Sequence, residues 1–350
     1  MTETTLKGKV QTVTGAVEPN TLGPTTTHEH LLIDFSCMFK EPAEATAWHR
    51  AHQPVTMENL GWVRYKSFAN LDNLMLIDEE DATAEAMIYM RAGGGTIVDA
   101  TTIGIGRDPL ALARIARATG LNIVMGAGYY VDAVHPDGMD SMTEADITRQ
   151  IVDEVRVGVG ETRVKAGIIG EIGCSWPLTD NERKVLRAAA LAQQETGAAV
   201  LIHPGRNPQA PQEVLDVLAE AGGDVGRTIM GHLDRTLTET DDVLALAKSG
   251  CYLEYDLFGW EVSYYSLGDL DMPNDAQRLG FIQRLVAEGY GDRVVMAQDI
   301  FAKHRTAKYG GHGYAHILDN IVPRMREKGF SAEEIDSIIV ANPARVLTFA

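Results

Sequence analysis

The stretch TTTHEHLLIDF, residues 25–35, places two histidines two positions apart at the start of an apolar segment. Side chains two positions apart in a β-strand point to the same face, so His28 and His30 would form one bidentate arm. Other short apolar runs also end in groups that can bind a metal, namely Glu171, His203, His232 and Asp299. Imidazole and carboxylate groups are the ligands that borderline divalent metals prefer.

Each of these residues has a simpler explanation when it is taken alone. A single histidine at a strand end is more often a hydrogen-bonded core residue, and a single carboxylate there is usually a helix cap. The six positions together favour ligands, because a bound cation removes the cost of burying an unpaired carboxylate. We therefore predict that the six residues converge on one metal site.

The elements that must position these residues form a repeating pattern. Eight runs rich in β-branched residues read as strands buried on both faces: 25–35, 94–103, 121–130, 166–173, 198–205, 227–235, 251–259 and 293–300. Helical patterns lie between them, for example at 78–93, 108–120, 179–197 and 241–250. Eight strand–helix pairs in about 300 residues indicate a TIM (β/α)8 barrel with the metal site at the C-terminal mouth of the strands. A doubly wound sheet is the alternative, although no Gly-rich dinucleotide motif follows any strand.

No linker or low-complexity tract divides the chain, so we expect a single domain over residues 1–350. A β-hairpin segment is expected within 1–23 and a C-terminal helix within 331–350. The connections 36–77, 260–275 and 301–316 are long and follow the first, seventh and eighth strands. In a barrel all three would lie at the mouth, where long loops are usually functional.

Composition excludes several classes of protein. The formal charge of -18 argues against a nucleic-acid partner, which requires a basic surface. The absence of a long apolar run or an apolar N-terminal region argues against a membrane span or a secretory signal. Three well-separated cysteines, Cys37, Cys174 and Cys251, do not form a disulfide framework. We expect a cytoplasmic protein with a small-molecule substrate.

Five motifs, TTTHEHL, IIGEIG, LIHPGR, IMGHLDR and MAQDI, in this order resemble the phosphotriesterase family of the amidohydrolase superfamily, most of all its phosphotriesterase-related branch. The segment NPARVL, residues 342–347, is similar to the closing helix of that superfamily. The resemblance implies a binuclear metal centre and a homodimer. It also implies that His28, His30 and Asp299 hold the more buried metal, and that His203 and His232 hold the more exposed one.

One position departs from the pattern of the family. Many members bridge their two metals with a carboxylated lysine at the end of strand four, where this chain has Glu171. The nearby Lys165 lies six residues earlier, roughly 20 Å back along a strand, towards the opposite face of the barrel. We therefore assign the bridge to Glu171. A glutamate is shorter than a carboxylated lysine, so the strand end must shift or bulge, which Gly170 and Gly173 would permit.

The ligand set predicts a hydrolytic mechanism. Two divalent ions about 3.5–4 Å apart would share a water and lower its pKa, so that hydroxide attacks a carbonyl or phosphoryl centre. Asp299 would accept the proton and pass it to the leaving group. Zinc is the default metal, but manganese, iron, cobalt and nickel also fit. Glu29 points the other way and is expected to be structural or a second-layer partner, and Asp99 either orients a ligand histidine or caps the next segment.

The substrate is less well defined by the sequence. Candidate contacts are Tyr129, Tyr130, Arg206, Arg235, Tyr255 and Trp260, with Lys303 and Arg305 nearby. Several cations at the mouth of an acidic protein suggest an anionic substrate group, unless they pair with acids such as Asp234 or Asp256. The preferred function is hydrolysis of a carboxylic ester, lactone or N-acyl amide. The alternatives are a phosphotriester or phosphodiester hydrolase and a non-catalytic small-molecule-binding protein.

Overall fold

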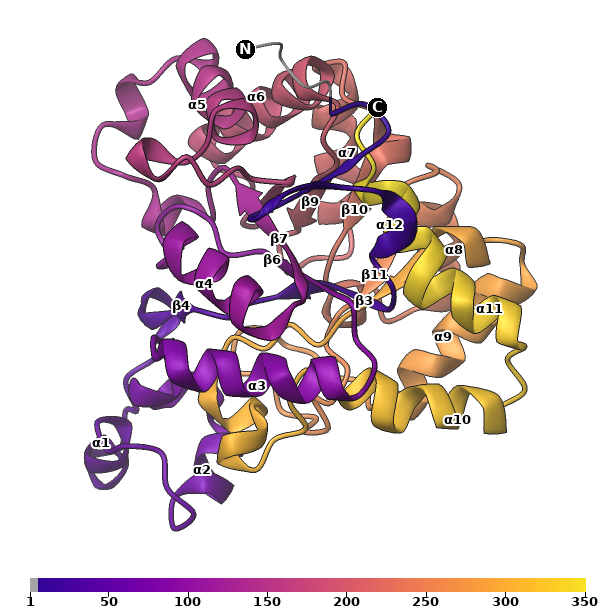
Figure 1. Cartoon of the computed structure of the whole chain (residues 1–350). Coiled ribbons are helices and arrows are strands. Elements are labelled where there is room, and N and C mark those ends of the chain that lie inside the picture. Colours follow the sequence, from indigo (N-terminus) through magenta and orange to yellow (C-terminus); the bar gives the residue numbers. More distant parts are fainter. Residues whose placement is uncertain (1–5) are drawn as a thin grey trace.

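The computed structural model describes residues 6–350, in which eight parallel strands form a nearly closed barrel surrounded by helices (Figure 1). The strands follow one another around the barrel in chain order: β3 (Thr25–Glu29), β6 (Thr96–Asp99), β7 (Asn122–Ala127), β8 (Ile168–Gly173), β9 (Val200–His203), β10 (Thr228–Met230), β11 (Tyr252–Tyr255) and β12 (Val294–Met296). The two edge strands meet where the Thr27 hydroxyl donates to the carbonyl of Met296 at 3.3 Å. The predicted TIM barrel is confirmed, and the doubly wound alternative is excluded.

Helices on the outside of the barrel cover the strands. They are α3 (Glu79–Arg91), α4 (Pro109–Thr119), α5 (Glu144–Arg156), α6 (Asp180–Thr196), α7 (Ala210–Glu220), α8 (Thr240–Ala247), α9 (Asp275–Ala287) and α10 (Val322–Glu327). Three of them begin with reciprocal capping boxes, at Thr143, Thr179 and Asn274, which satisfy backbone N–H groups of the first turn. No helix among residues 6–350 is both long enough and apolar enough to cross a bilayer.

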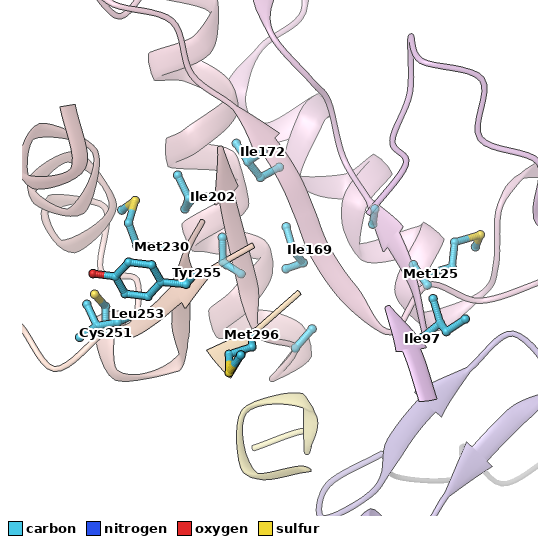
Figure 2. Close-up of a cluster of buried hydrophobic side chains, with 14 of the residues drawn as sticks. Ile97, Met125, Ile169, Ile172, Ile202, Met230, Cys251, Leu253, Tyr255 and Met296 are labelled. Atoms are coloured by element: carbon cyan, nitrogen blue, oxygen red, sulfur yellow. The ribbon is translucent and has the colours of Figure 1, made fainter. Parts of the chain in front are cut away.

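Alternation along each strand separates two apolar layers. One set of strand residues packs outwards against the helices, and Figure 2 shows Ile97, Met125, Ile169, Ile202, Met230, Leu253 and Met296. The residues at intervening positions form a second cluster: Val98, Val124, Ile168, Leu201, Ile229, Tyr252 and Val295. This second cluster fills the barrel interior, because it lies on the strand faces turned away from the helices.

The N-terminal end of the barrel is closed by segments from both ends of the chain. The hairpin β1 (Val10–Thr12) and β2 (Gly15–Val17) contributes Val10, and α12 (Asn342–Leu347) contributes Val346 and Leu347 to the interior cluster. The final helical run consists of α11 (Ala332–Asp336), a π-helical turn (Ser337–Ala341) and α12. With this end filled by apolar side chains, the polar ends of the strands are left at the opposite mouth.

Two of the long connections meet over that mouth. The first contains the strands β4 (Ile33–Asp34) and β5 (Met75–Leu76) and the helices α1 (Ala45–Ala51) and α2 (Leu60–Tyr65). Tyr65 in this connection stacks on Tyr264 in the connection after β11, with ring centroids 4.9 Å apart. Lys40 Nζ also donates to the carbonyl of Ser266 at 2.8 Å. These contacts place both connections around the polar strand ends.

Candidate metal centre and substrate cavity

All six predicted ligand residues lie together at the mouth of the barrel, and each is buried, with at most 6% of its surface exposed. Glu171 lies between the imidazoles: its Oε1 is 2.5 Å from His203 Nδ1, 2.8 Å from His232 Nε2 and 3.4 Å from His28 Nε2. Asp299 Oδ1 is 3.3 Å from His30 Nε2. The structure therefore brings the residues of five different strand ends to one point.

The far nitrogens of three histidines are engaged by a second layer of polar groups. His28 Nδ1 lies 3.1 Å from both Glu254 Oε2 and Asp256 Oδ2, and His232 Nδ1 lies 2.9 Å from Asp256 Oδ1. His30 Nδ1 donates to the Thr101 hydroxyl at 2.9 Å, because that hydroxyl gives its own proton to the carbonyl of Leu32. These contacts leave Nε2 of His28, His30 and His232 facing the centre, which is how second-layer groups orient metal-binding histidines.

The chemistry of this donor set fits divalent cations. His28 Nε2 is buried and has no hydrogen-bond partner among residues 6–350, although it faces the centre of the cluster. Donor atoms of His28, His30 and Asp299, and those of His28, Glu171 and His232, lie within 4.8 Å of one another in each group. A cation between them would satisfy the open nitrogen and balance the buried carboxylates.

Electrostatics keeps two of the central groups, Glu171 and His203, in the forms that bind metals. Burial favours a protonated Glu171, but His203 and His28 outweigh this effect and hold the pKa of Glu171 well below its ordinary value. Burial lowers the pKa of His203 well below its ordinary value despite the nearby charge of Glu171. A carboxylate and a neutral imidazole are the ligand forms of these side chains.

The end of β8 is shifted where Glu171 enters the centre. The pairing of β8 with β9 changes register between Ile169 and Ile172. Gly170 has a φ of +121°, and a side chain there would meet the carbonyl oxygen of Leu201 at 2.2 Å, so this position requires glycine. Lys165 precedes β8 at its other end and does not reach the cluster.

Two acidic residues, one in each of the first two barrel strands, accept hydrogen bonds from backbone N–H groups. Asp99 accepts from the N–H groups of Leu31 at 2.8 Å and Thr101 at 3.1 Å, so it caps these segments and contacts no ligand imidazole. Asp99 was expected either to orient a ligand histidine or to cap the next segment. The cap is what the structure shows, and Thr101 instead orients His30. Glu29 points away from the centre and accepts backbone N–H groups beside Asp299.

A small cavity of about 20 Å³ opens beside the ligand cluster. Its walls include four of the six predicted substrate contacts, namely Tyr130, Arg206, Arg235 and Trp260, and aromatic residues from the long connections: Phe35, Phe68, Tyr265 and Phe301. The cavity therefore has cations and aromatic rings beside the candidate metal centre.

The two arginines of the cavity differ in how their donors are used. Arg206 Nε donates to the Tyr265 hydroxyl at 2.7 Å, and its two terminal nitrogens donate to no residue within 6–350. Arg235 Nη2 contacts His203 Nε2 at 3.0 Å and the carbonyl of Pro204 at 3.1 Å. Neither arginine pairs with Asp234, which instead accepts from Arg278 Nε at 2.9 Å.

The structure does not bring Tyr129 and Tyr255 to the cavity. The Tyr129 hydroxyl donates to Gln150 Oε1 at 2.5 Å, and the Tyr255 ring stacks on Phe281 of α9 among the outward-facing side chains of Figure 2. Alternation is the reason, because each tyrosine lies next to an inward-facing position. Nor do the other two cations reach the cavity: Lys303 pairs with Asp72 at 2.7 Å, and Arg305 donates to the carbonyls of Phe258 and Gln298.

The sequence did not predict the residues that hydrogen-bond to the ligand histidines. Glu254 and Asp256 are two positions apart at the end of β11, as His28 and His30 are in the first strand, and this spacing was a usable signal. Phe35 and Thr101 fall within the predicted runs 25–35 and 94–103 but beyond the ends of the observed strands, and Phe68 lies in a long connection without a regular period.

Comparison with known proteins gives consistent matches over nearly the whole chain. Residues 8–347 match the model of the phosphotriesterase family. The N-acetyltaurine hydrolase of Salmo salar is 49% identical over 346 residues, which cover 98% of this chain and 99% of that protein.

Two solved structures extend these similarities. A resiniferatoxin-binding protein from Rhodobacter sphaeroides superposes with a TM-score of 0.94 and 36% identity, covering 97% of this chain and 95% of that one. A lactonase from Listeria monocytogenes gives a TM-score of 0.79 and 27% identity, covering 98% and 99% of the two chains.

Proposed function

Because this chain belongs to the phosphotriesterase family, we propose that it is a binuclear metal-dependent hydrolase of N-acyl amides whose amine part carries an anionic group. Membership makes the chain a hydrolase of amide or ester substrates, and the family fold implies divalent metal ions. The number of ions, the anionic group and the roles of individual residues are the proposed part.

The ligand residues divide into two sets around Glu171. His28, His30 and Asp299 would hold one ion, and His203 and His232 the other, with Glu171 between them. Divalent ions held there, zinc being the first to test, would supply hydroxide at neutral pH and polarise the scissile carbonyl.

Asp299 is proposed to move the proton. Its carboxylate faces both the ligand cluster and the substrate cavity. It can accept the proton of the attacking water and deliver it to the nitrogen of the leaving amine, since cleavage of an amide needs that nitrogen to be protonated. The aromatic walls exclude bulk water from this transfer.

The position of Arg206 is the main support for an anionic group on the substrate. Its Nε donates to the Tyr265 hydroxyl at 2.7 Å, and its two terminal nitrogens, which donate to no group among residues 6–350, can form a fork at the cavity wall. A planar fork of N–H donors suits a sulfonate or carboxylate. N-acetyltaurine, the substrate in the name of the Salmo salar relative, carries a sulfonate on its amine part and a small acyl group.

The experiment measures kcat/KM of the zinc-loaded protein on four substrates. They are N-acetyltaurine, N-propylacetamide as its neutral counterpart, a γ-lactone and a phosphotriester. We expect about two metal ions per chain and a kcat/KM for N-acetyltaurine at least about tenfold above that for the neutral amide. Preference for the lactone or the phosphotriester would replace the amide proposal, and metal-loaded protein that cleaves none of the four would refute it.

A further inference from the structure

Asp299 lies outside the regular strand that precedes it. β12 ends at Met296, and Asp299 has a φ of +47°. Residues other than glycine rarely adopt this left-handed conformation. Strand pairing therefore cannot fix the direction of the Asp299 carboxylate, and other contacts must hold it.

Three successive backbone N–H groups around Asp299 all donate to the first barrel strand. The N–H of Gln298 donates to Glu29 Oε1 at 2.8 Å, that of Asp299 to the carbonyl of His28 at 3.0 Å, and that of Ile300 to Glu29 Oε2 at 2.9 Å. One carboxylate thus accepts the N–H groups of the residues before and after Asp299. The Thr26 hydroxyl donates to Glu29 Oε1 at 2.5 Å and fixes that carboxylate in turn.

Glu29 is also the residue between His28 and His30. Its backbone belongs to the strand that carries the two histidines, while its fully buried side chain points to the opposite side and reaches the segment of Asp299. We propose that Glu29 is a positioning residue that sets Asp299 against the two histidines. The inference deepens the proposed function and rests on it, because it assigns to Glu29 the alignment of the ligands of one metal.

A second buried glutamate, Glu85, provides a control that distinguishes positioning of a metal ligand from general support of the backbone. Glu85 of α3 is 4% exposed and also accepts two successive N–H groups, those of Ala307 at 2.9 Å and Lys308 at 2.8 Å. It holds a connection in the same way, but its carboxylate is not bonded to the segment of any proposed ligand. Glu85→Gln is therefore the matched control for Glu29→Gln.

The experiment compares these two variants with wild-type protein. A glutamine at position 29 turns its amide nitrogen towards one of the two N–H groups, so one of these bonds is lost. We expect Glu29→Gln to lower zinc affinity, measured by competition with a chromophoric chelator, by about 10- to 100-fold. At saturating zinc, kcat for N-acetyltaurine should fall at least about tenfold with KM within about twofold, because Arg206 is untouched.

Glu85→Gln should change zinc affinity and kcat by less than about twofold, although the two variants lose similar thermal stability. Equal effects of both variants on zinc affinity, or wild-type values in Glu29→Gln, would overturn the inference while leaving the proposed function intact. Wild-type protein that neither binds zinc nor cleaves substrate would refute the proposed function itself.

Thr26→Val provides a milder test if Glu29→Gln does not fold. It keeps the volume and removes the hydroxyl that anchors the Glu29 carboxylate. Zinc affinity should then fall by about two- to tenfold, in the range of one lost hydrogen bond. A folded Thr26→Val variant with unchanged affinity would also contradict the positioning role.

Discussion

Glu171 is the single residue on which the arrangement of the centre depends most. Its carboxylate lies within 3.4 Å of nitrogens from three histidines, which come from three different strands. The register of β8 shifts between Ile169 and Ile172, and this shift brings the short side chain of Glu171 into the centre. A longer carboxylated lysine would reach the centre without such a shift. A carboxylate at this place needs no carboxylation to bridge two ions, and its bridging role remains a prediction.

The bridge can be tested by counting metals. Glu171→Gln removes the negative charge and should leave about one divalent ion per chain instead of two, because an amide is a weak bridging ligand. Metal analysis after zinc loading and gel filtration measures this ratio. Lys165→Met is the control, and it should retain the wild-type content. Two ions in Glu171→Gln would mean that another group forms the bridge.

Arg206 gives a second prediction at the same scale. Arg206→Met keeps much of the length and apolar volume but removes the fork, so KM for N-acetyltaurine should rise by about 10- to 100-fold. The KM of the neutral N-propylacetamide should not change. Tyr265→Phe, which removes only the acceptor of Arg206 Nε, should raise KM for the anionic substrate by less. A parallel rise for both substrates in Arg206→Met would instead indicate loss of packing.

At the scale of strands, most of the barrel and its mouth could be predicted from the sequence. Strands buried on both faces have continuous apolar sequences, and polar residues at their ends stand out against this background. Alternation along a strand predicts which side chains face the barrel interior, as it does for His28 and His30. Applied to β11, it places Glu254 and Asp256 inside and Tyr255 outside, as the structure has them.

The connections could not be predicted in the same way. Phe35, Phe68 and Phe301 reach the cavity from segments without a regular period, so nothing local in the sequence indicates where their rings point. Their positions depend on contacts between connections far apart in the chain, such as the stacking of Tyr65 on Tyr264. These contacts join segments that are far apart in the sequence, so no local pattern indicates them.

Trp260, in the connection after β11, leads to a prediction about the length of the acyl group that the substrate can carry. Its ring packs 6.0 Å from Phe301 on the side of the substrate cavity, and the guanidinium of Arg305 lies 5.4 Å from its centroid. Trp260 lines both the cavity of about 20 Å³ and a second one of about 370 Å³, so it separates them. Removing the ring should join the two spaces.

We therefore expect Trp260→Ala to accept longer acyl groups. The ratio of kcat/KM for N-hexanoyltaurine to that for N-acetyltaurine should rise at least about tenfold, since each buried methylene contributes about 0.8 kcal/mol. Trp260→Phe keeps most of the wall and should change the ratio much less. An unchanged ratio in Trp260→Ala would place the acyl group elsewhere in the cavity.

At the scale of the whole molecule, the chain has a formal charge of -18, yet two cations, Arg206 and Arg235, line the substrate cavity. The buried Arg278 does not add to this charge, because it pairs with Asp234 and Asp275. Two arginines in the cavity of an acidic protein agree with an anionic small-molecule substrate. The homodimer remains a prediction, which sedimentation of the full chain would test.

The buried His304 makes the stability of the whole fold depend on pH. Its backbone N–H and Nδ1–H both donate to Asn73 Oδ1 at 3.0 Å. Burial, with the positive charges of Arg305 and Arg64, lowers the pKa of His304 to about 3. In the unfolded chain a histidine binds a proton below about pH 6.5.

The stability that comes from neutral His304 is therefore complete above about pH 6.5 and is lost as pH falls towards 3. One such group contributes at most about 1.4 kcal/mol per pH unit to the free energy of unfolding. Urea unfolding of chelator-treated protein between pH 7.5 and 4.5 should show a shallower pH dependence for His304→Gln than for wild type, by up to this slope. His49→Gln, at an exposed position, is the matched control. Parallel curves for wild type and His304→Gln would show that His304 is not buried in its neutral form.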